Sequence, residues 1–247
     1  MSSLAGRSIG YDVSAYQVRG VLIDLGFPLV ARAVAQYLTR ARPDAILITH
    51  HHEDHGGNVE LAARMRIPIG ASDATLESLR SPERLGLHRR IIWGNPPALR
   101  TPIVRFASDA LRLVQTPGHA ADHHVVWDAE RETMFGGDLF LGVKVRAAHA
   151  DERPRELVRS LRHAASLHPR RYFDAHRGLV RDPVSALLAK ADWLEQTIDA
   201  IERRIEQGWS NRAIARAVLG REDVAYYVSR GAMSRIMLVS RVRDEIA

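Results

Sequence analysis

Apolar residues form short strand-like runs that alternate with segments of helical periodicity over roughly the first 180 residues. The strand-like runs lie at 45–49, 111–115, 124–127 and 132–135. Apolar residues recur at helical spacing at 29–37, 60–65 and 156–167. Strands and helices mixed in this way along a chain predict an α/β body with helices layered on sheets.

The last quarter of the chain has a helical pattern only. Asp182 followed by Pro183 indicates an N-cap with proline at the first helical position. Gly208 is expected to end that helix and Ser210 to cap the next one. A last helix is predicted at 233–246. The predicted organisation is therefore an α/β catalytic domain at 1–180 and a helical domain at 181–247.

The composition excludes several classes of protein. The 247 residues include no cysteine, so disulfides, iron–sulfur clusters, thiolate-bound zinc and a cysteine nucleophile are all excluded. No apolar run approaches 18 residues, so no membrane span is expected. The segment 1–7 lacks the apolar core of a signal peptide, and we therefore expect a cytoplasmic protein.

The charge pattern gives a weaker indication of the substrate. The formal net charge is +6, with 35 basic against 29 acidic side chains, and no block of five like charges occurs. A dispersed excess of this kind attracts anions weakly but does not by itself predict a nucleic-acid-binding protein.

Histidine carries the candidate chemistry. Four of the 12 histidines fall between 50 and 55, in the sequence THHHEDHGG that follows the predicted strand at 45–49. The spacing of His50, His52, Asp54 and His55 does not fit one face of a helix. In a loop that follows a strand, His50 and His52 can bind one metal ion. Asp54 and His55 then face a second ion beside it. Imidazole and carboxylate suit zinc, iron or manganese.

Three further ligand-type residues each follow a predicted strand. His119, Asp138 and His176 stand at the ends of the runs that finish near 115, 135 and 174. Strand ends are where an α/β scaffold places its functional residues. We expect these side chains to complete the metal site.

Five stretches, in their order and spacing, resemble the metallo-β-lactamase fold superfamily. They are 21–26, 49–57, 116–119, 137–138 and residue 176. The resemblance implies a fold of the α/β class, the four-layer αββα sandwich. It also implies two divalent metal ions, with zinc expected first and iron or manganese as alternatives.

The same resemblance assigns roles to individual residues. The ligands implied for the first ion are His50, His52 and His119. The ligands implied for the second ion are Asp54, His55 and His176. Asp138 would bridge the two ions, and Asp24 would hydrogen-bond the ligand loop. Asp54 is also the predicted catalytic residue, which orients the attacking water and moves its proton.

Two segments suggest a narrower resemblance. Residues 116–123 and 137–142 are similar to the lactamase-β-like branch, which contains endoribonucleases and carries a winged-helix-like C-terminal domain. Glyoxalase II-like thioesterases also carry helical tails.

Two basic residues are candidates for substrate binding. Arg177 stands where the family often has glycine, so it either contacts an anion or points to solvent. Lys144, in the loop after Asp138, either holds a substrate carboxylate or phosphate or is solvated.

Three functions remain in contention. The first is hydrolysis of a small ester, thioester or lactone by a metal-bridging hydroxide, and the second is a phosphodiesterase or endoribonuclease. The third is a mononuclear iron dioxygenase of the persulfide type, which the complete set of seven ligands disfavours. A true β-lactamase is not expected, because a bridging aspartate such as Asp138 is typical of the other hydrolase branches of the superfamily. Without an aromatic and basic stripe, a small-molecule partner is favoured over nucleic acid, and a homodimer stays open.

Overall fold

Two β-sheets form the centre of the computed structural model, which describes residues 12–246. The segment 1–7, on which the expectation about a signal peptide rests, lies outside this range. The first sheet has the order β1 (Tyr16–Val18), β2 (Val21–Ile23), β3 (Ala45–Leu47), β4 (Ile69–Gly70). The second has the order β5 (Arg112–Gln115), β6 (His124–Asp128), β7 (Thr133–Phe135), β8 (Arg171–Asp174), β9 (Gly178–Val180).

Both sheets are mixed. In the first, β2, β3 and β4 are parallel and β1 pairs antiparallel with β2. In the second, β7 and β8 are parallel and the other pairs are antiparallel. The parallel pairs place several strand ends at one edge of the sandwich, which is where the candidate ligands follow.

Helices flank the two sheets and extend beyond them. Those that accompany the first sheet are η1 (Pro28–Val30), α2 (Ala31–Ala41), α3 (Val59–Arg64), α4 (Asp73–Arg80) and α5 (Leu87–Ile92). The remaining helices are α6 (Pro154–Ser166), α7 (Pro183–Glu206), α8 (Asn211–Val218), α9 (Val224–Ser229) and α10 (Arg235–Asp244). Ser210 caps α8 by accepting a hydrogen bond from the backbone of Ala213, as the sequence predicted.

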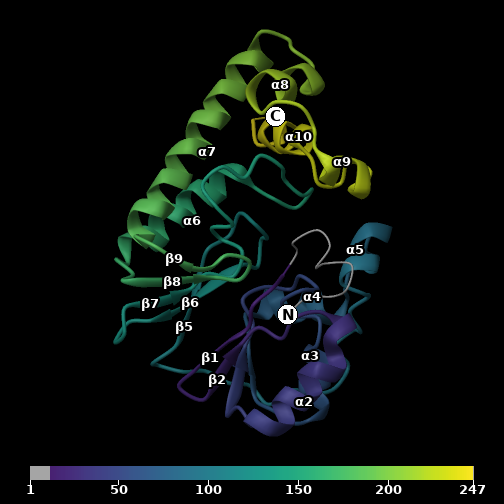
Figure 1. Cartoon of the computed structure of the whole chain (residues 1–247), viewed down its shortest axis with the longest axis vertical. Helices are drawn as coiled ribbons and strands as arrows, with labels where there is room; N and C mark the ends of the chain where they lie inside the picture. Colours follow the sequence, from purple (N-terminus) through teal and green to yellow (C-terminus); the bar gives the residue numbers. More distant parts are fainter. Residues whose placement is uncertain (1–11, 247) are drawn as a thin grey trace.

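The alternation of side chains along the strands produces four layers. In β2, Leu22 packs with the apolar faces of α2 and α3, while Val21 and Ile23 face the second sheet. In β6, Val126 joins Val21 and Ile23 between the sheets, and Val125 packs on the opposite face with α6 and α7. Figure 1 shows α2 and α3 on one outer side and α6 and α7 on the other. The predicted αββα sandwich with C-terminal helices is confirmed.

The C-terminal helices share an apolar core with the second sheet. Leu187, Leu194 and Ile198 of α7 belong to the same buried cluster as Leu161 of α6 and Tyr172 of β8. The boundary predicted at residue 181 falls between β9 and α7, and the division into separate domains stays a prediction. Across residues 12–246, no helix combines the length and apolar character that crossing a bilayer requires.

Candidate metal centre

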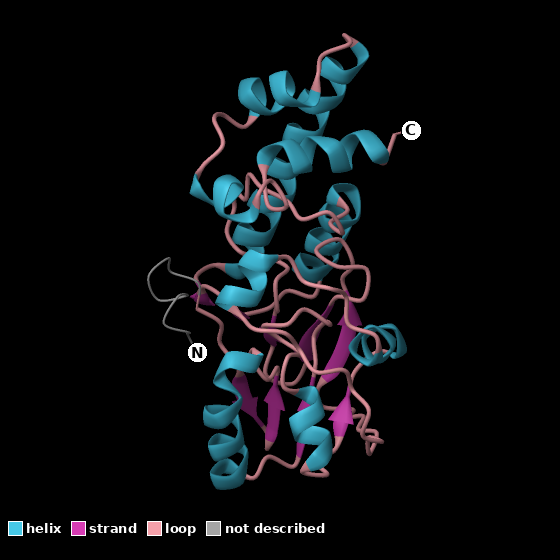
Figure 2. Cartoon of the chain, turned by 90° about the vertical axis from the view of Figure 1, so that its right-hand side faces the viewer, coloured by secondary structure: helices cyan, strands magenta, loops and turns pink. Residues whose placement is uncertain are grey.

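Four loops that follow strand ends bring the predicted ligands together. The histidine-rich loop follows β3, His119 follows β5, Asp138 follows β7 and His176 follows β8. Figure 2 shows that loops fill the region between the strands and the C-terminal helices. Residues that lie up to 126 positions apart in sequence therefore meet because strand topology places their strand ends at one edge.

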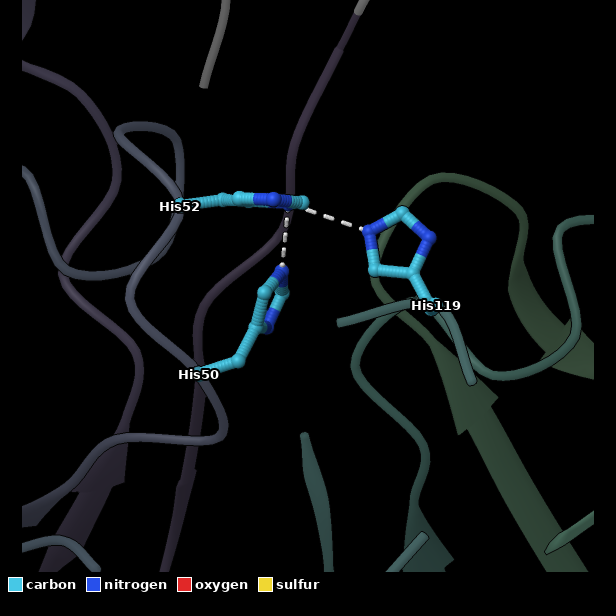
Figure 3. Close-up of side chains that lie close together, drawn as sticks. All are labelled: His50, His52 and His119. Carbon is cyan, nitrogen blue, oxygen red and sulfur yellow. Dashed lines mark hydrogen bonds between the residues drawn. The ribbon is translucent and has the colours of Figure 1, made fainter. Parts of the chain in front are cut away.

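Three buried imidazoles form the first ligand set. The Nδ1 atom of His52 lies 3.0 Å from Nε2 of His50 and 3.0 Å from Nε2 of His119. Figure 3 shows the three rings turned toward one point. One nitrogen from each ring lies within 4.8 Å of the others, a separation that a single metal ion can span.

The second set consists of two imidazoles and two carboxylates. His176 Nε2 lies 3.4 Å from Oδ2 of Asp54 and 3.3 Å from Oδ1 of Asp138. His55 Nε2 lies 3.1 Å from the same oxygen of Asp138 and 3.8 Å from Oδ2 of Asp54. All four side chains are buried or nearly so.

Asp138 lies between the two sets. Its Oδ1 atom faces His55 and His176, and its Oδ2 atom lies 3.4 Å from Nε2 of His119 in the first set. One carboxylate with an oxygen toward each set has the geometry of a bridging ligand.

The residues fit a pair of divalent metal ions. Nε2 of His55 and Oδ1 of Asp138 are buried and lie 3.1 Å apart, yet neither atom makes a hydrogen bond of acceptable geometry within residues 12–246. Buried polar atoms without a partner are uncommon and costly, and metal coordination would satisfy both. A set of imidazole nitrogens and carboxylate oxygens, without thiolates, suits zinc, iron or manganese.

In His50, His55 and His176, the ring nitrogen that points away from the ligand set also has a hydrogen-bond partner. Asp24 Oδ2 lies 2.8 Å from Nδ1 of His55, and Asp24 also accepts hydrogen bonds from the backbone and hydroxyl of Thr49. The hydroxyl of Thr49 lies 3.0 Å from Nδ1 of His50. The carbonyl of Asp12 lies 2.6 Å from Nδ1 of His176. Such partners fix the orientation and tautomer of a metal-binding histidine.

The two sets differ in charge. Burial lowers the pKa of His50 well below its usual value, and the neighbouring rings of His55 and His52 add to this shift. Burial also acts to lower the pKa of His176, but Asp138 and Asp54 outweigh it and raise that pKa. The rings of His176 and His55 in turn hold the pKa of Asp138 well below its usual value, against the opposing effect of burial. The surroundings of His50 therefore disfavour positive charge, whereas the carboxylates of the second set stabilise positive charge next to His176, whether on its ring or on a bound ion.

Several residues of the site were not predicted from the sequence. Lys190 of α7 is buried, and its Nζ donates hydrogen bonds to the carbonyls of Leu139 and Phe140, directly after Asp138. Its place on the apolar face of α7, three residues after Leu187 and four before Leu194, is a signal that the sequence does contain.

Two other unpredicted contacts hold the ligand loops. Arg89 of α5 forms a two-pronged ion pair with Glu53, its Nε lying 2.7 Å from Oε1, inside the histidine-rich loop. His123 accepts a hydrogen bond from the backbone of Asp138 at 3.1 Å. Both contacts join residues that are distant in sequence, so they cannot be predicted from the local spacing of residues.

The two predicted substrate-binding residues lie at the surface. Lys144 is exposed on the loop after Asp138. Arg177 is also exposed, and its Nε donates to the carbonyl of Leu141 at 3.1 Å. Their roles in substrate binding stay predictions.

The sequence pattern described as the Metallo-beta-lactamase superfamily matches residues 12–176. The chain belongs to this superfamily. The Beta-lactamase-like protein 2 homolog of Drosophila melanogaster is 28% identical over 182 residues, which are 68% of this chain and 58% of the relative. A Hydroxyacylglutathione hydrolase of Rhodospirillum rubrum is 36% identical over 96 residues, 38% of this chain and 32% of the relative. The chain thus spans less than two thirds of the length of these relatives.

A solved structure supports the fold over nearly the whole chain. A metallo-beta-lactamase family protein from Thermus thermophilus superposes with a TM-score of 0.67 at 18% identity. The superposition covers 94% of this chain and 88% of that protein, so it includes the C-terminal helices as well as the sandwich.

We expect two metal ions per chain, because the seven residues supply two complete sets. Elemental analysis after saturation with zinc, iron or manganese should give a ratio near two. His176→Ala should lower it toward one, whereas His163→Ala, at an exposed position of α6, should leave it at two. A wild-type ratio that stays at one at saturating metal would contradict the dinuclear assignment.

Proposed function

We propose that the protein is a dinuclear metal-dependent hydrolase of a small ester, thioester or lactone. The observation that supports this most directly is a pocket that adjoins the ligand sets. His119 and Asp138 are among its lining residues, and Leu157, Trp193 and Leu194 of α6 and α7 contribute apolar lining. Its volume of about 20 Å³ accommodates a group about the size of one water molecule, so only the hydrolysable end of a small substrate would occupy it.

The proposed roles follow from where the side chains lie. Divalent ions, when bound, supply Lewis-acid polarisation of a carbonyl and make water a nucleophile near neutral pH. Asp138 fixes the distance between the two ligand sets. Asp54 Oδ2 lies at the edge of the second set, where the carboxylate can orient the attacking water and accept its proton. The contacts of Lys190 hold the backbone that follows Asp138.

The pocket also holds two ionisable side chains besides Asp138. Lys190 is buried and Glu152 is nearly so, with 12% of its side chain exposed. Burial raises the pKa of Glu152 and lowers the pKa of Lys190, so burial disfavours the charged form of both groups. This effect of burial is in keeping with an uncharged acyl group beside these two side chains.

The C-terminal helices do not carry the charge expected of a nucleic-acid platform. Residues 183–247 include ten basic and nine acidic side chains. Tight binding of nucleic acid requires a clear excess of positive charge that neutralises phosphates. The relative named Hydroxyacylglutathione hydrolase also supports an acyl substrate over a phosphodiester.

The test is a panel of substrates offered to the metal-loaded protein. We expect hydrolysis of thioesters or lactones at rates well above that of bis-p-nitrophenyl phosphate. The activity should vanish when the metal is removed by a chelator and return when zinc, iron or manganese is added back. Asp54→Asn should lose most of the rate, and Asp73→Asn, at an exposed ion pair with Arg105, serves as the control for loss of one carboxylate.

The same experiment includes a single-stranded RNA. Binding at low salt is measured and salt is then titrated upward, because phosphate contacts weaken steeply with salt. Submicromolar binding that falls with salt and disappears when Arg212 and Arg216 are reversed in charge would contradict the small-substrate proposal. Cleavage of the phosphodiester alone would contradict it as well.

A further inference from the structure

The segment that leads into α6 lies between the histidine-rich loop and the C-terminal helices. Ala148 pairs with Ser234 through two backbone hydrogen bonds of 3.1 and 3.3 Å, which form an isolated antiparallel bridge. Arg241 of α10 donates from Nη1 to the carbonyl of Ala150 at 2.8 Å. Figure 1 shows α10 above the strand ends, on the side of the molecule where the ligand loops lie. The C-terminal helices therefore fix the course of this segment.

Asp151 is the next residue of the segment, and it contacts a metal-site histidine. Its Oδ2 atom lies 3.0 Å from Nε2 of His52. The other ring nitrogen, Nδ1 of His52, is the one that faces His50 and His119. His52 is only 6% exposed, whereas the side chain of Asp151 is 43% exposed. The aspartate thus reaches from the surface to the far side of a buried ring.

The contact decides which nitrogen of His52 can bind a metal ion. A neutral imidazole has one N–H and one lone pair, and the partner of the N–H sets which nitrogen carries the proton. An ionised carboxylate only accepts hydrogen bonds, so Asp151 keeps the proton on Nε2 and leaves the lone pair on Nδ1, toward the first set.

The partner of His52 differs from the partners of three other ligand histidines. Thr49, Asp24 and Asp12 hold His50, His55 and His176, respectively, and all three come from the first 49 residues of the chain. The outer nitrogen of His119, Nδ1, instead lies 3.9 Å from Oε1 of Glu152, the neighbour of Asp151. Asp151 comes instead from the segment that α10 and the residue before it hold in place. This difference links the first ligand set to the C-terminal helices.

We propose that Asp151 is a positioning residue for the first metal site and that the C-terminal helices set its place. The helices then act on metal affinity through a short path, from Arg241 and Ser234 to the 148–151 segment and on to His52. This inference rests on metal binding at the first set and not on the identity of the substrate.

Metal affinity measured by competition with a chromogenic chelator tests the role of Asp151. Loss of an outer partner of a metal-binding histidine typically weakens metal binding by about 10- to 100-fold. We expect a loss of this size at the first site in Asp151→Ala, with the second site unchanged. Asp151→Asn keeps an acceptor oxygen and should lose less. Asp192→Asn, at an exposed ion pair with Arg162, should bind both ions as the wild type does.

The role of the helices is tested by Arg241→Ala, alone and combined with Asp151→Ala. Alone it should weaken the first site less than Asp151→Ala does, and in the combination it should add nothing, because both changes act through one contact. Effects that add would show that the helices do not act through Asp151 and would overturn that part of the proposal.

Two outcomes would overturn the role of Asp151 while leaving the proposed hydrolase intact. One is wild-type affinity at the first site in Asp151→Ala. The other is a wild-type protein that binds three ions and loses one of them in this variant. Asp151 lies within ligand distance of His51 as well as His52, so it would then be a ligand of a further ion. A wild type that binds no metal would instead contradict the proposed function itself.

Discussion

Asp138→Asn is expected to lower kcat/KM by about a thousandfold or more while the protein stays folded. The asparagine keeps the shape of the side chain but removes the negative charge that faces both ligand sets. Stabilisation by metal ions contributes several kcal/mol to such reactions, and a loss of about 4 kcal/mol corresponds to a thousandfold in rate. Hydrolysis of the best substrate of the panel and metal content should be measured on the same sample.

Two comparisons separate the loss of the bridge from a loss of structure. Circular dichroism of Asp138→Asn should match that of the wild-type protein, since the substitution changes no volume in the core. Thermal unfolding is compared between the metal-free proteins, because loss of bound metal by itself lowers the unfolding temperature. Asp73→Asn removes one carboxylate at an exposed position and should retain full activity. Hydrolysis by Asp138→Asn at the wild-type rate would show that the bridging assignment is wrong.

The residues that the structure brings together as ligand sets could be predicted because they follow strands. A strand end has a defined direction, and the H-x-H-x-D-H spacing limits how His50, His52 and His55 can point. His119, Asp138 and His176 each stand within four residues of a strand end. Local pattern and chain direction therefore suffice to predict that these side chains meet, and the geometry agrees.

The contacts that hold the ligands could not be predicted in the same way. Asp151 and His52 are 99 residues apart, and Arg89 and Glu53 are 36 apart. The sequence separation of neither pair indicates a contact. Each contact depends on how the helices and loops pack against one another in the folded protein. Some short elements were missed as well. The helices α5 and α9 have six residues each, which is less than two helical turns and leaves periodicity a weak signal. The helix α3 has the same length, and its pattern at 60–65 was nevertheless recognised.

Gly118, directly before His119, packs tightly against the backbone of α6. Its φ angle is +130°, which side chains rarely allow. A Cβ atom at this position would lie 2.3 Å from the backbone nitrogen of Leu157 and 2.4 Å from its Cα. The carbonyl of Gly118 also accepts a hydrogen bond from the backbone of Arg153 at 2.7 Å. The first turn of α6 thus packs directly on the loop that carries His119.

Gly118→Ala is therefore expected to damage stability and metal binding together. Strain at positive φ combined with a backbone clash should lower the free energy of unfolding by about 3 kcal/mol or more. His119 and the segment of Asp151 lie on the two sides of the clash, so the first metal site should be lost while the second is retained. Denaturant unfolding of the metal-free protein and elemental analysis measure the two effects.

Gly208→Ala is the matched control for this prediction, because it separates the effect of backbone strain at positive φ from the effect of a steric clash. Gly208 also has a positive φ, of +77°, but within the described residues no atom outside its own stretch of chain lies within 4 Å of where its Cβ would be. This variant should lose about 1 kcal/mol from backbone strain alone and should still bind two ions. If both variants lose the same stability and both keep two ions, contact with α6 does not position His119. The loop after β5 would then have to be held by its own hydrogen bonds, chiefly that between the backbone of Thr116 and the carbonyl of His123.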